Sequence, residues 1–246
     1  MRKFILIFII CLSFGICFAE NMHQAQIDNG EENFKKGDFQ KTVEIYESLI
    51  RIEKVKDPYV YYNLSNAYYR AGNIGKAILN IEKALKLAPR EKDIKENAQF
   101  LRVAAGQKRE RNIQGVLLER FSLNEITVIL SIFIILFLLS FSLFLLKINT
   151  SIKKTIILFV IFLIICLPLF VLKGCDEFFV KKAIVLSSSV VRSGPCENNP
   201  EIFRISEGKA VNIISESGDW VNINVQSKGE SSSGWIEAKN IGSINE

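Results

Sequence analysis

The sequence predicts a multidomain membrane protein with an all-α helical repeat region, a two-helix transmembrane hairpin and a small all-β barrel. Three observations lead to this fold class. Two long uncharged apolar runs lie in the middle of the chain, a helix-turn-helix pattern recurs before them, and short β-branched runs between turn residues follow them. We expect the repeat region at residues 24–104, the hairpin at 126–172 and the β-domain at 181–246.

Composition limits the classes of function that are open to the chain. It has 246 residues and a formal net charge of +5. Nearly a fifth of the chain lies in the predicted hairpin, so each remaining piece must be small. No basic run stands out, which argues against a nucleic-acid partner.

The first 19 residues have the layout of a secretory signal peptide. Arg2 and Lys3 precede an apolar run at residues 4–14, and Ala19 ends a short stretch that contains small residues. This layout predicts cleavage after Ala19, with an uncleaved membrane anchor as the alternative. Both interpretations place the following segment outside the cytoplasm.

The central apolar runs predict the hairpin. Residues 126–146 carry no charge over 21 positions, and such a helix would span roughly 30 Å, the thickness of a bilayer core. Residues 155–172 form a second uncharged run, after a loop at 147–154 that contains three lysines and is expected in the cytoplasm. We therefore expect the lipid bilayer as a partner, in a two-pass protein of the bacterial cytoplasmic (inner) membrane whose soluble regions are both extracytoplasmic. A pair of buried helices in a large soluble core is the alternative.

A helix-turn-helix pattern recurs upstream of these runs. Residues 33–39 recur at 68–74, and Gly37 and Gly72 lie 35 positions apart, close to a period of 34. The second copy closely resembles a tetratricopeptide repeat, on the basis of Tyr61, Leu64, Tyr68, Ala77, Ile81, Ala84 and Pro89. In the first copy, Thr42 takes a position normally given to a small Ala. A further helix, with Ile94, Ala98 and Leu101 on one face, is expected to cap the array, and residues 105–125 are expected to form a spacer.

This resemblance implies a concave groove that binds peptides or partner proteins. Its positions would be Tyr59, Tyr62, Asn66, Tyr69 and Arg70, with Ile27, Glu31 and Phe34 from the first copy. Because these positions are aromatic rather than multiply basic, a clamp for C-terminal carboxylates is not expected. Tyr61 and Tyr68 are interpreted as core residues. Tyr62 and Tyr69 are candidate anchors for a partner, since exposed aromatic side chains are typical of interfaces.

The C-terminal region contains short β-branched runs. Strands are expected at residues 183–186, 190–192, 210–214, 220–225 and 235–236, and turns at 218–219 and 228–234. The region resembles a bacterial SH3-like domain in Val191-Arg192-Ser193-Gly194-Pro195, Glu207-Gly208, Asp219-Trp220-Val221 and Gly234-Trp235-Ile236. We expect Trp220 and Trp235 to supply most of its large apolar area, with ligand binding as the alternative role.

The order of these parts resembles the BatE-type bacterial aerotolerance (Bat) proteins. This resemblance implies a non-catalytic membrane scaffold that works beside von Willebrand A-type Bat proteins and is linked to aerotolerance or envelope stress. The alternative is a cell-wall anchor or sensor that binds peptidoglycan through its SH3-like domain.

No catalytic, metal or cofactor site is expected. His23 is the only histidine, and neither a pair of closely spaced cysteines nor a phosphate-binding glycine loop occurs. Cys175 and Cys196 would both lie outside the cytoplasm, where they are candidates for a disulfide; two unrelated thiols are the alternative.

Overall fold

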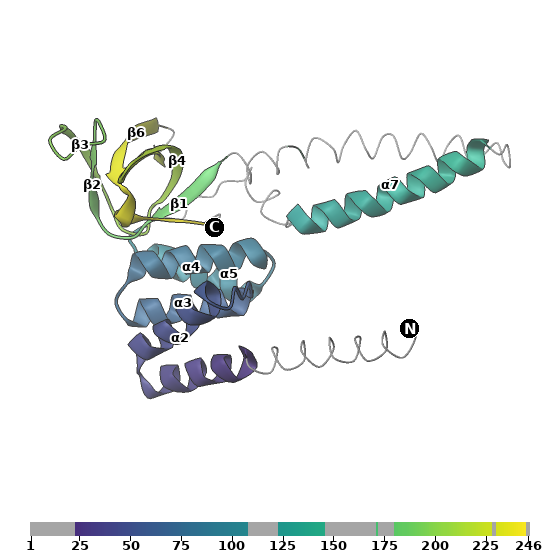
Figure 1. Cartoon of the computed structure of the whole chain (residues 1–246), viewed down its shortest axis with the longest axis horizontal. Helices are drawn as coiled ribbons and strands as arrows, with labels where there is room; N and C mark the ends of the chain where they lie inside the picture. Colours follow the sequence, from purple (N-terminus) through teal and green to yellow (C-terminus); the bar gives the residue numbers. More distant parts are fainter. Residues whose placement is uncertain (1–22, 108–122, 146–170, 172–179, 228–229, 245–246) are drawn as a thin grey trace, which may run out of the picture.

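The computed structural model describes residues 23–107, 123–145, 171, 180–227 and 230–244 (Figure 1). Within these residues, a helical region and an antiparallel sheet domain pack side by side (Figure 1). The helical region consists of a first helix at residues 23–36, followed by α2 (Phe39–Arg51), α3 (Pro58–Arg70), α4 (Ile74–Leu87) and α5 (Lys92–Ala104).

Local signals set the starts of these helices. The Asp38 carboxylate accepts a hydrogen bond from the backbone N–H of Lys41 at 3.1 Å, and Asp57 accepts from that of Tyr59 at 2.7 Å. Such caps satisfy the N–H groups that the first turn of a helix leaves unpaired. Gly72 has a φ of +83° in the turn before α4, where residues with a Cβ are strained.

Two residues of the first copy, the small Gly30 and the polar Thr42, are explained by the close approach of neighbouring helices. A Cβ at Gly30 would lie 2.7 Å from the ring of Tyr46, so only glycine fits against that ring. Thr42 is fully buried, and its hydroxyl donates to the carbonyl of Asp38 at 2.8 Å. The backbone therefore satisfies the hydroxyl, which allows Thr at a position where an Ala was expected.

The helix α5 is the last helix described in the helical region, and part of its exposed surface is polar, as expected of a cap. Ile94, Ala98 and Leu101 are buried on its inner side. The residues that stand 34 positions after the buried Tyr61, Ser65 and Tyr68 are Lys95, Gln99 and Arg102, and all three are exposed. Because these residues are polar, a further helix has no apolar surface there against which to pack.

The sheet domain has seven antiparallel strands in the order β3-β2-β6-β5-β4-β1-β7. Their bounds are β1 (Lys181–Val185), β2 (Ser189–Arg192), β3 (Glu201–Ile205), β4 (Ala210–Ser217), β5 (Trp220–Ser227), β6 (Glu230–Glu237) and β7 (Ile241–Ser243), with a short 3-10 helix, Ala238–Asn240, before β7. The core is aliphatic, and Val191, Ile223 and Ile236 are among its fully buried residues.

Three details of this domain differ from the expectation. The edge strand β3 was not predicted, because charged Glu201 and Arg204 interrupt its apolar residues. The described residues of the expected turn at 228–234 belong to β6, which pairs with β5 from Glu230 onward. Neither tryptophan belongs to the core; Trp220 and Trp235 are half-buried on the opposite face.

The predicted two-helix transmembrane hairpin is wrong. Across the segments that the structure describes, no helix combines the length and the apolar character needed to cross a membrane. The first apolar run forms α7 (Leu123–Leu145), whose first turn contains Glu125, paired with Arg90 at 2.9 Å. The second run lies, apart from residue 171, outside the described residues, as do the signal peptide and the loop at 147–154.

The prediction of a membrane-spanning first helix was based only on the length of the uncharged run at residues 126–146. The helix α7 begins before the uncharged run and takes the acidic Glu125 into its first turn. The inference of a lipid bilayer as a partner rested on the hairpin, and the described residues give it no support.

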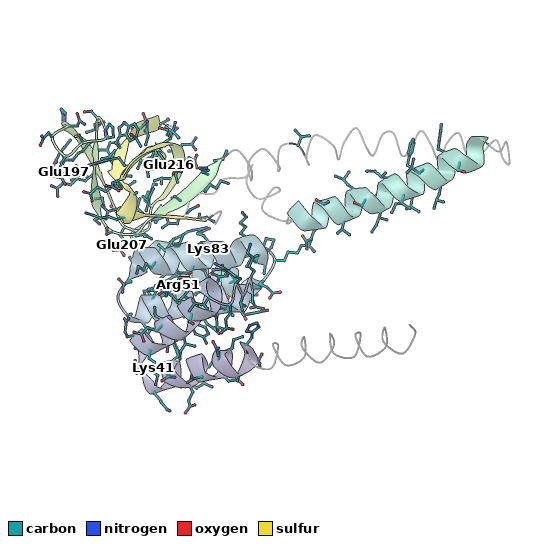
Figure 2. The ribbon with its side chains drawn as sticks, viewed as in Figure 1. Lys41, Arg51, Lys83, Glu197, Glu207 and Glu216 are labelled. Carbon is teal, nitrogen blue, oxygen red and sulfur yellow. The ribbon has the colours of Figure 1, made fainter. Side chains whose placement is uncertain are left out.

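The two regions are joined through α4. The Gly75 N–H in the first turn of α4 donates to Glu207 Oε1 at 2.6 Å, although these residues lie 132 positions apart (Figure 2). Gln107 Nε2 donates to the carbonyl of Gly208 at 2.7 Å, and Ile184 of β1 is buried within the helical core. The sheet domain thus supplies the side-chain cap that Asn73, at the N-cap of α4, does not make.

Candidate functional site

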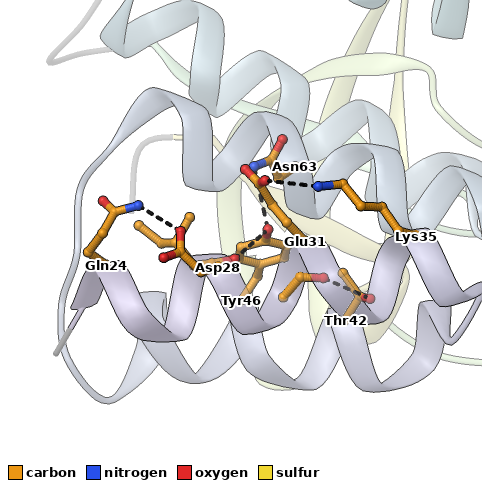
Figure 3. Close-up of polar contacts among 9 residues, drawn as sticks. Gln24, Asp28, Glu31, Lys35, Thr42, Tyr46 and Asn63 are labelled. Atoms are coloured by element: carbon orange, nitrogen blue, oxygen red, sulfur yellow. Dashed lines mark hydrogen bonds and ion pairs between the residues drawn. The ribbon is translucent and has the colours of Figure 1, made fainter.

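The helical region contains a pocket between the first helix and α3. Its volume is about 180 Å³. Its lining residues are Glu31, Phe34 and Lys35 of the first helix, Tyr46 of α2, and Asn63 and Asn66 of α3. Figure 3 shows Glu31, Lys35, Tyr46 and Asn63. We call this the interhelical pocket. Two aromatic rings, two amides and both signs of charge therefore converge on one concave site.

Tyr46 forms the floor of the interhelical pocket. Its side chain is almost fully buried, its hydroxyl donates to the carbonyl of Ile27 at 3.4 Å, and Asn63 Nδ2 donates to the hydroxyl at 3.4 Å (Figure 3). Burial raises the pKa of Tyr46 to about 12, and the nearby carboxylates of Glu31 and Asp28 act in the same direction. The floor is therefore an uncharged polar group at neutral pH.

The rim of the pocket is charged and exposed. Lys35 Nζ lies 3.9 Å from a carboxylate oxygen of Glu31, and Gln24 Nε2 donates to Asp28 at 2.9 Å (Figure 3). Exposed ion pairs of this kind contribute little to stability. Their side chains can consequently turn toward a ligand at low cost.

The helix α5 extends the concave surface beyond α3. Asn97 Nδ2 donates to Asn66 Oδ1 at 2.7 Å, and the ring of Phe100 packs edge-on against Tyr69 with centroids 5.3 Å apart. Phe100 is 52% exposed. We define the groove as the interhelical pocket together with Asn97 and Phe100.

Sequence reasoning missed Asn97 and Phe100, because α5 was interpreted only as a cap. The signal was present in the period: Asn97 stands 34 positions after Asn63, and Phe100 stands 34 after Asn66. Extending the 34-residue period from α3 into α5 would have identified both residues.

The structure brings some of the predicted groove residues together and separates others. Phe34, Glu31 and Asn66 line the interhelical pocket. Tyr62 and Tyr69 are half-buried and pack against the helical core, as does Ile27. The anchoring role of the two tyrosines therefore remains a prediction about side chains that are only partly accessible.

Two predicted residues lie at the ends of α3. Tyr59 is 52% exposed at the start of the helix, and the carboxylate of Glu91 raises the pKa of its hydroxyl. Arg70 is the last residue of α3, and its guanidinium lies 5.1 Å from the ring centroid of Phe39, which packs edge-on against Phe34. This contact holds one positive charge beside the aromatic side of the groove.

One helix pair of this region, which includes the groove helix α3, matches a known family. Residues 58–91 match the family model of the tetratricopeptide repeat. The match covers α3, the turn at Gly72 and α4, and it confirms the repeat predicted from Tyr61, Ala77 and Pro89. The search of curated proteins finds no match.

The tetratricopeptide repeat is a non-catalytic interaction module, so this chain carries a protein–protein interaction scaffold. The partners that such a scaffold implies are other proteins. The matched repeat supplies Asn63 and Asn66, and the flanking helices supply the other groove residues.

The remaining candidates lie away from the groove. Cys196 is exposed in the segment after β2, whereas Cys175 lies outside the described residues, so their pairing remains a prediction. Among the residues described, no group of three or more His, Cys, Asp or Glu side chains could hold a metal ion.

Proposed function

We propose that this protein is a non-catalytic scaffold that holds an extended segment of a partner protein in the groove between the first helix, α3 and α5. The observation that carries the proposal is that Asn63 and Asn66 of the tetratricopeptide repeat line the interhelical pocket, and that Asn97 of α5 donates a hydrogen bond to Asn66. Each amide can both donate and accept, which suits the alternating N–H and C=O groups of an extended backbone.

Aromatic side chains flank this row of amides. Phe34 lines the interhelical pocket at one end, and Phe100 is exposed at the other. Apolar side chains of a bound segment can pack on both rings while the amides hold its backbone. Because aromatic residues dominate the energetics of interfaces, we assign most of the binding energy to these two.

The test begins with selection of binding peptides from a displayed library against the full chain. A selected peptide is then measured by fluorescence polarisation against wild type and an Asn66→Ala/Phe100→Ala double variant. We expect the double variant to bind at least about tenfold more weakly, the size of effect typical of lost interface anchors.

A matched control comes from the polar edge of α5. Gln99→Ala/Lys95→Ala changes two exposed residues of the same helix, outside the groove. Equal losses for the control and the groove variant would contradict the proposal. Unchanged binding by a folded Tyr62→Ala/Tyr69→Ala variant would remove only the anchoring role of these tyrosines.

We also propose that the scaffold acts outside the cytoplasm with a Bat-type von Willebrand A protein as its partner. Support comes from the predicted signal peptide at residues 1–19 and from the pairing of a repeat region with a C-terminal β-domain that resembles the SH3-like type. Reporter fusions after residue 107 test the export. Reporter activity confined to the cytoplasm would exclude this placement, while the groove proposal would still stand.

A further inference from the structure

The two tryptophans of the chain lie on one face of the sheet domain. Trp220 and Trp235 are the only ones in the sequence. Their neighbours Val221 and Ile236 are buried in the core, and successive side chains of a strand point to opposite faces. Both indoles therefore belong to the outer face, where each is half-buried.

Strand register places specific polar residues beside the indoles. Trp235 lies directly opposite Asn222 of β5 and opposite Arg192 of β2, and Trp220 lies opposite Ser217 of β4. Directly opposite residues share a face of the sheet. We call this surface the tryptophan face; its members are Arg192, Ser215, Ser217, Trp220, Asn222, Asn224, Ser233, Trp235 and Glu237.

The charges at the border of the tryptophan face are already paired within the domain. Arg192 donates to the carbonyl of Asn199 at 2.9 Å and lies 3.6 Å from a carboxylate oxygen of Glu201. Glu237 pairs with Lys239 at 2.7 Å. Every other member is a serine, an asparagine or a tryptophan. The face is therefore electrically neutral and carries many uncharged hydrogen-bonding groups.

One polar atom of the face has no internal partner. The Oδ1 atom of Asn222 is buried and accepts no hydrogen bond within the described part of the chain. An acceptor left in this state is costly, and each such case in a native protein calls for an explanation. Asn222 lies opposite Trp235, so a ligand that displaces the indole slightly and donates a hydrogen bond would satisfy this atom.

We propose that the tryptophan face binds a neutral glycan. Sugar rings present flat C–H surfaces that stack on indoles, and their hydroxyl and acetamido groups exchange hydrogen bonds with serine and asparagine side chains. A glycan suits this face because all members except Arg192 and Glu237 are indoles or uncharged hydrogen-bonding groups, and these two charges already have partners within the domain. This site is separate from the groove and does not depend on the function proposed for it.

The position of both tryptophans on this face provides a direct measurement. Intrinsic fluorescence of the full chain reports on the tryptophan face and on no other tryptophan. We would titrate the protein with a tetramer of β-1,4-linked N-acetylglucosamine, with cellotetraose and with trialanine. The expected result is a saturable change of emission with at least one saccharide and a smaller or absent change with trialanine.

Single-tryptophan variants assign the response to each indole. In Trp220→Phe and in Trp235→Phe the remaining indole should still respond to the saccharide. Asn222→Ala should weaken binding at least about tenfold, as expected when a buried hydrogen-bonding group is lost from a site. Lys181→Ala is the control and should bind as wild type does, because this exposed residue of β1 lies opposite the core-facing Ile213 and therefore outside the tryptophan face.

If Asn222→Ala does not fold, the site is tested instead by the changes that the saccharide causes in the amide chemical shifts of the wild-type protein. Saccharide-induced shifts concentrated at residues 192, 215–224 and 233–237 would support the site. The proposal is overturned if neither saccharide changes the emission, if trialanine gives the larger change, or if the saccharide-induced shifts fall elsewhere.

Discussion

The helical region and the sheet domain place their aromatic residues in opposite ways. In the helical region, Tyr46, Tyr61 and Tyr68 are buried between helices. In the sheet domain the fully buried residues are aliphatic, and both tryptophans lie on the outer face. Buried aromatic rings therefore stabilise the helical region, whereas the indoles of the sheet domain remain available to a ligand.

The packing geometry of each region explains this difference. Paired helices leave wide spaces at their contacts, and Tyr46 fills one of them opposite Gly30, where a Cβ would approach its ring to 2.7 Å. In the small sheet domain the largest fully buried side chains are branched aliphatic ones, such as Ile223 and Ile236. Four of the predictions below test this contrast and the contact between the two regions, from the largest expected effect to the smallest.

The largest effect is expected for Tyr46→Ala. Truncation of a large buried ring should lower the free energy of unfolding by about 3–5 kcal/mol. Trp220→Ala, on the half-buried outer face, should cost about 1 kcal/mol, the centre of the range for single substitutions. Urea denaturation followed by circular dichroism measures both. Equal losses of unfolding free energy in the two variants would contradict the proposed difference between the two regions.

The contact between the regions is tested by Gly75→Ala. In an isolated helix this change would stabilise α4 by about 1 kcal/mol. In the docked protein, the new Cβ would lie 2.6 Å from the carbonyl oxygen of Leu186 in the sheet domain. We expect a loss of about 1–3 kcal/mol, as for other overpacked sites. A gain in stability would show that the sheet domain does not rest on α4 in solution.

The buried tyrosines predict a loss of stability at high pH. The folded-state pKa of Tyr46 is about 12, above its ordinary value of 10.0, and burial raises the pKa of Tyr68 as well. The stability that these neutral hydroxyls support is therefore complete below pH of about 10 and is lost as pH rises toward 12. Urea denaturation across this range should show a shallower decline for Tyr46→Phe than for wild type. Identical declines would contradict the raised pKa.

The smallest effect is expected for Glu207→Gln. A glutamine can still accept the hydrogen bond from the Gly75 N–H, but the negative charge at the N-terminus of α4 is lost. The expected cost is about 0.3–1 kcal/mol. Hydrogen exchange of the first amides of α4 should accelerate in this variant. Glu216→Gln, on the sheet domain away from α4, serves as the control and should leave these amides unchanged (Figure 2).

The sequence predicts the helical region well because its signals are local. Asp38 and Asp57 cap the helices that follow them, and the period of 34 residues places Tyr61, Ala77 and Pro89. Three residues of the interhelical pocket in the prediction, Glu31, Phe34 and Asn66, come from the same repeat pattern.

Other features depend on contacts between distant residues, which a pattern along the chain does not contain. The hydrogen bond between Gly75 and Glu207 joins residues 132 positions apart. The tryptophans were assigned to the core by their size, but alternation along β5 and β6 gives the core positions to Val221 and Ile236. The transmembrane prediction failed because it relied on the length of uncharged runs alone.

The most direct test of the scaffold account is site-specific photo-crosslinking in cells. A photoreactive residue replaces Asn66 in the groove or, as the matched control, Gln99 on the polar edge of α5. The account predicts that a discrete protein partner is crosslinked from position 66 and not from position 99. Crosslinking from position 99 alone, or equally from both positions, would contradict a partner held in the groove.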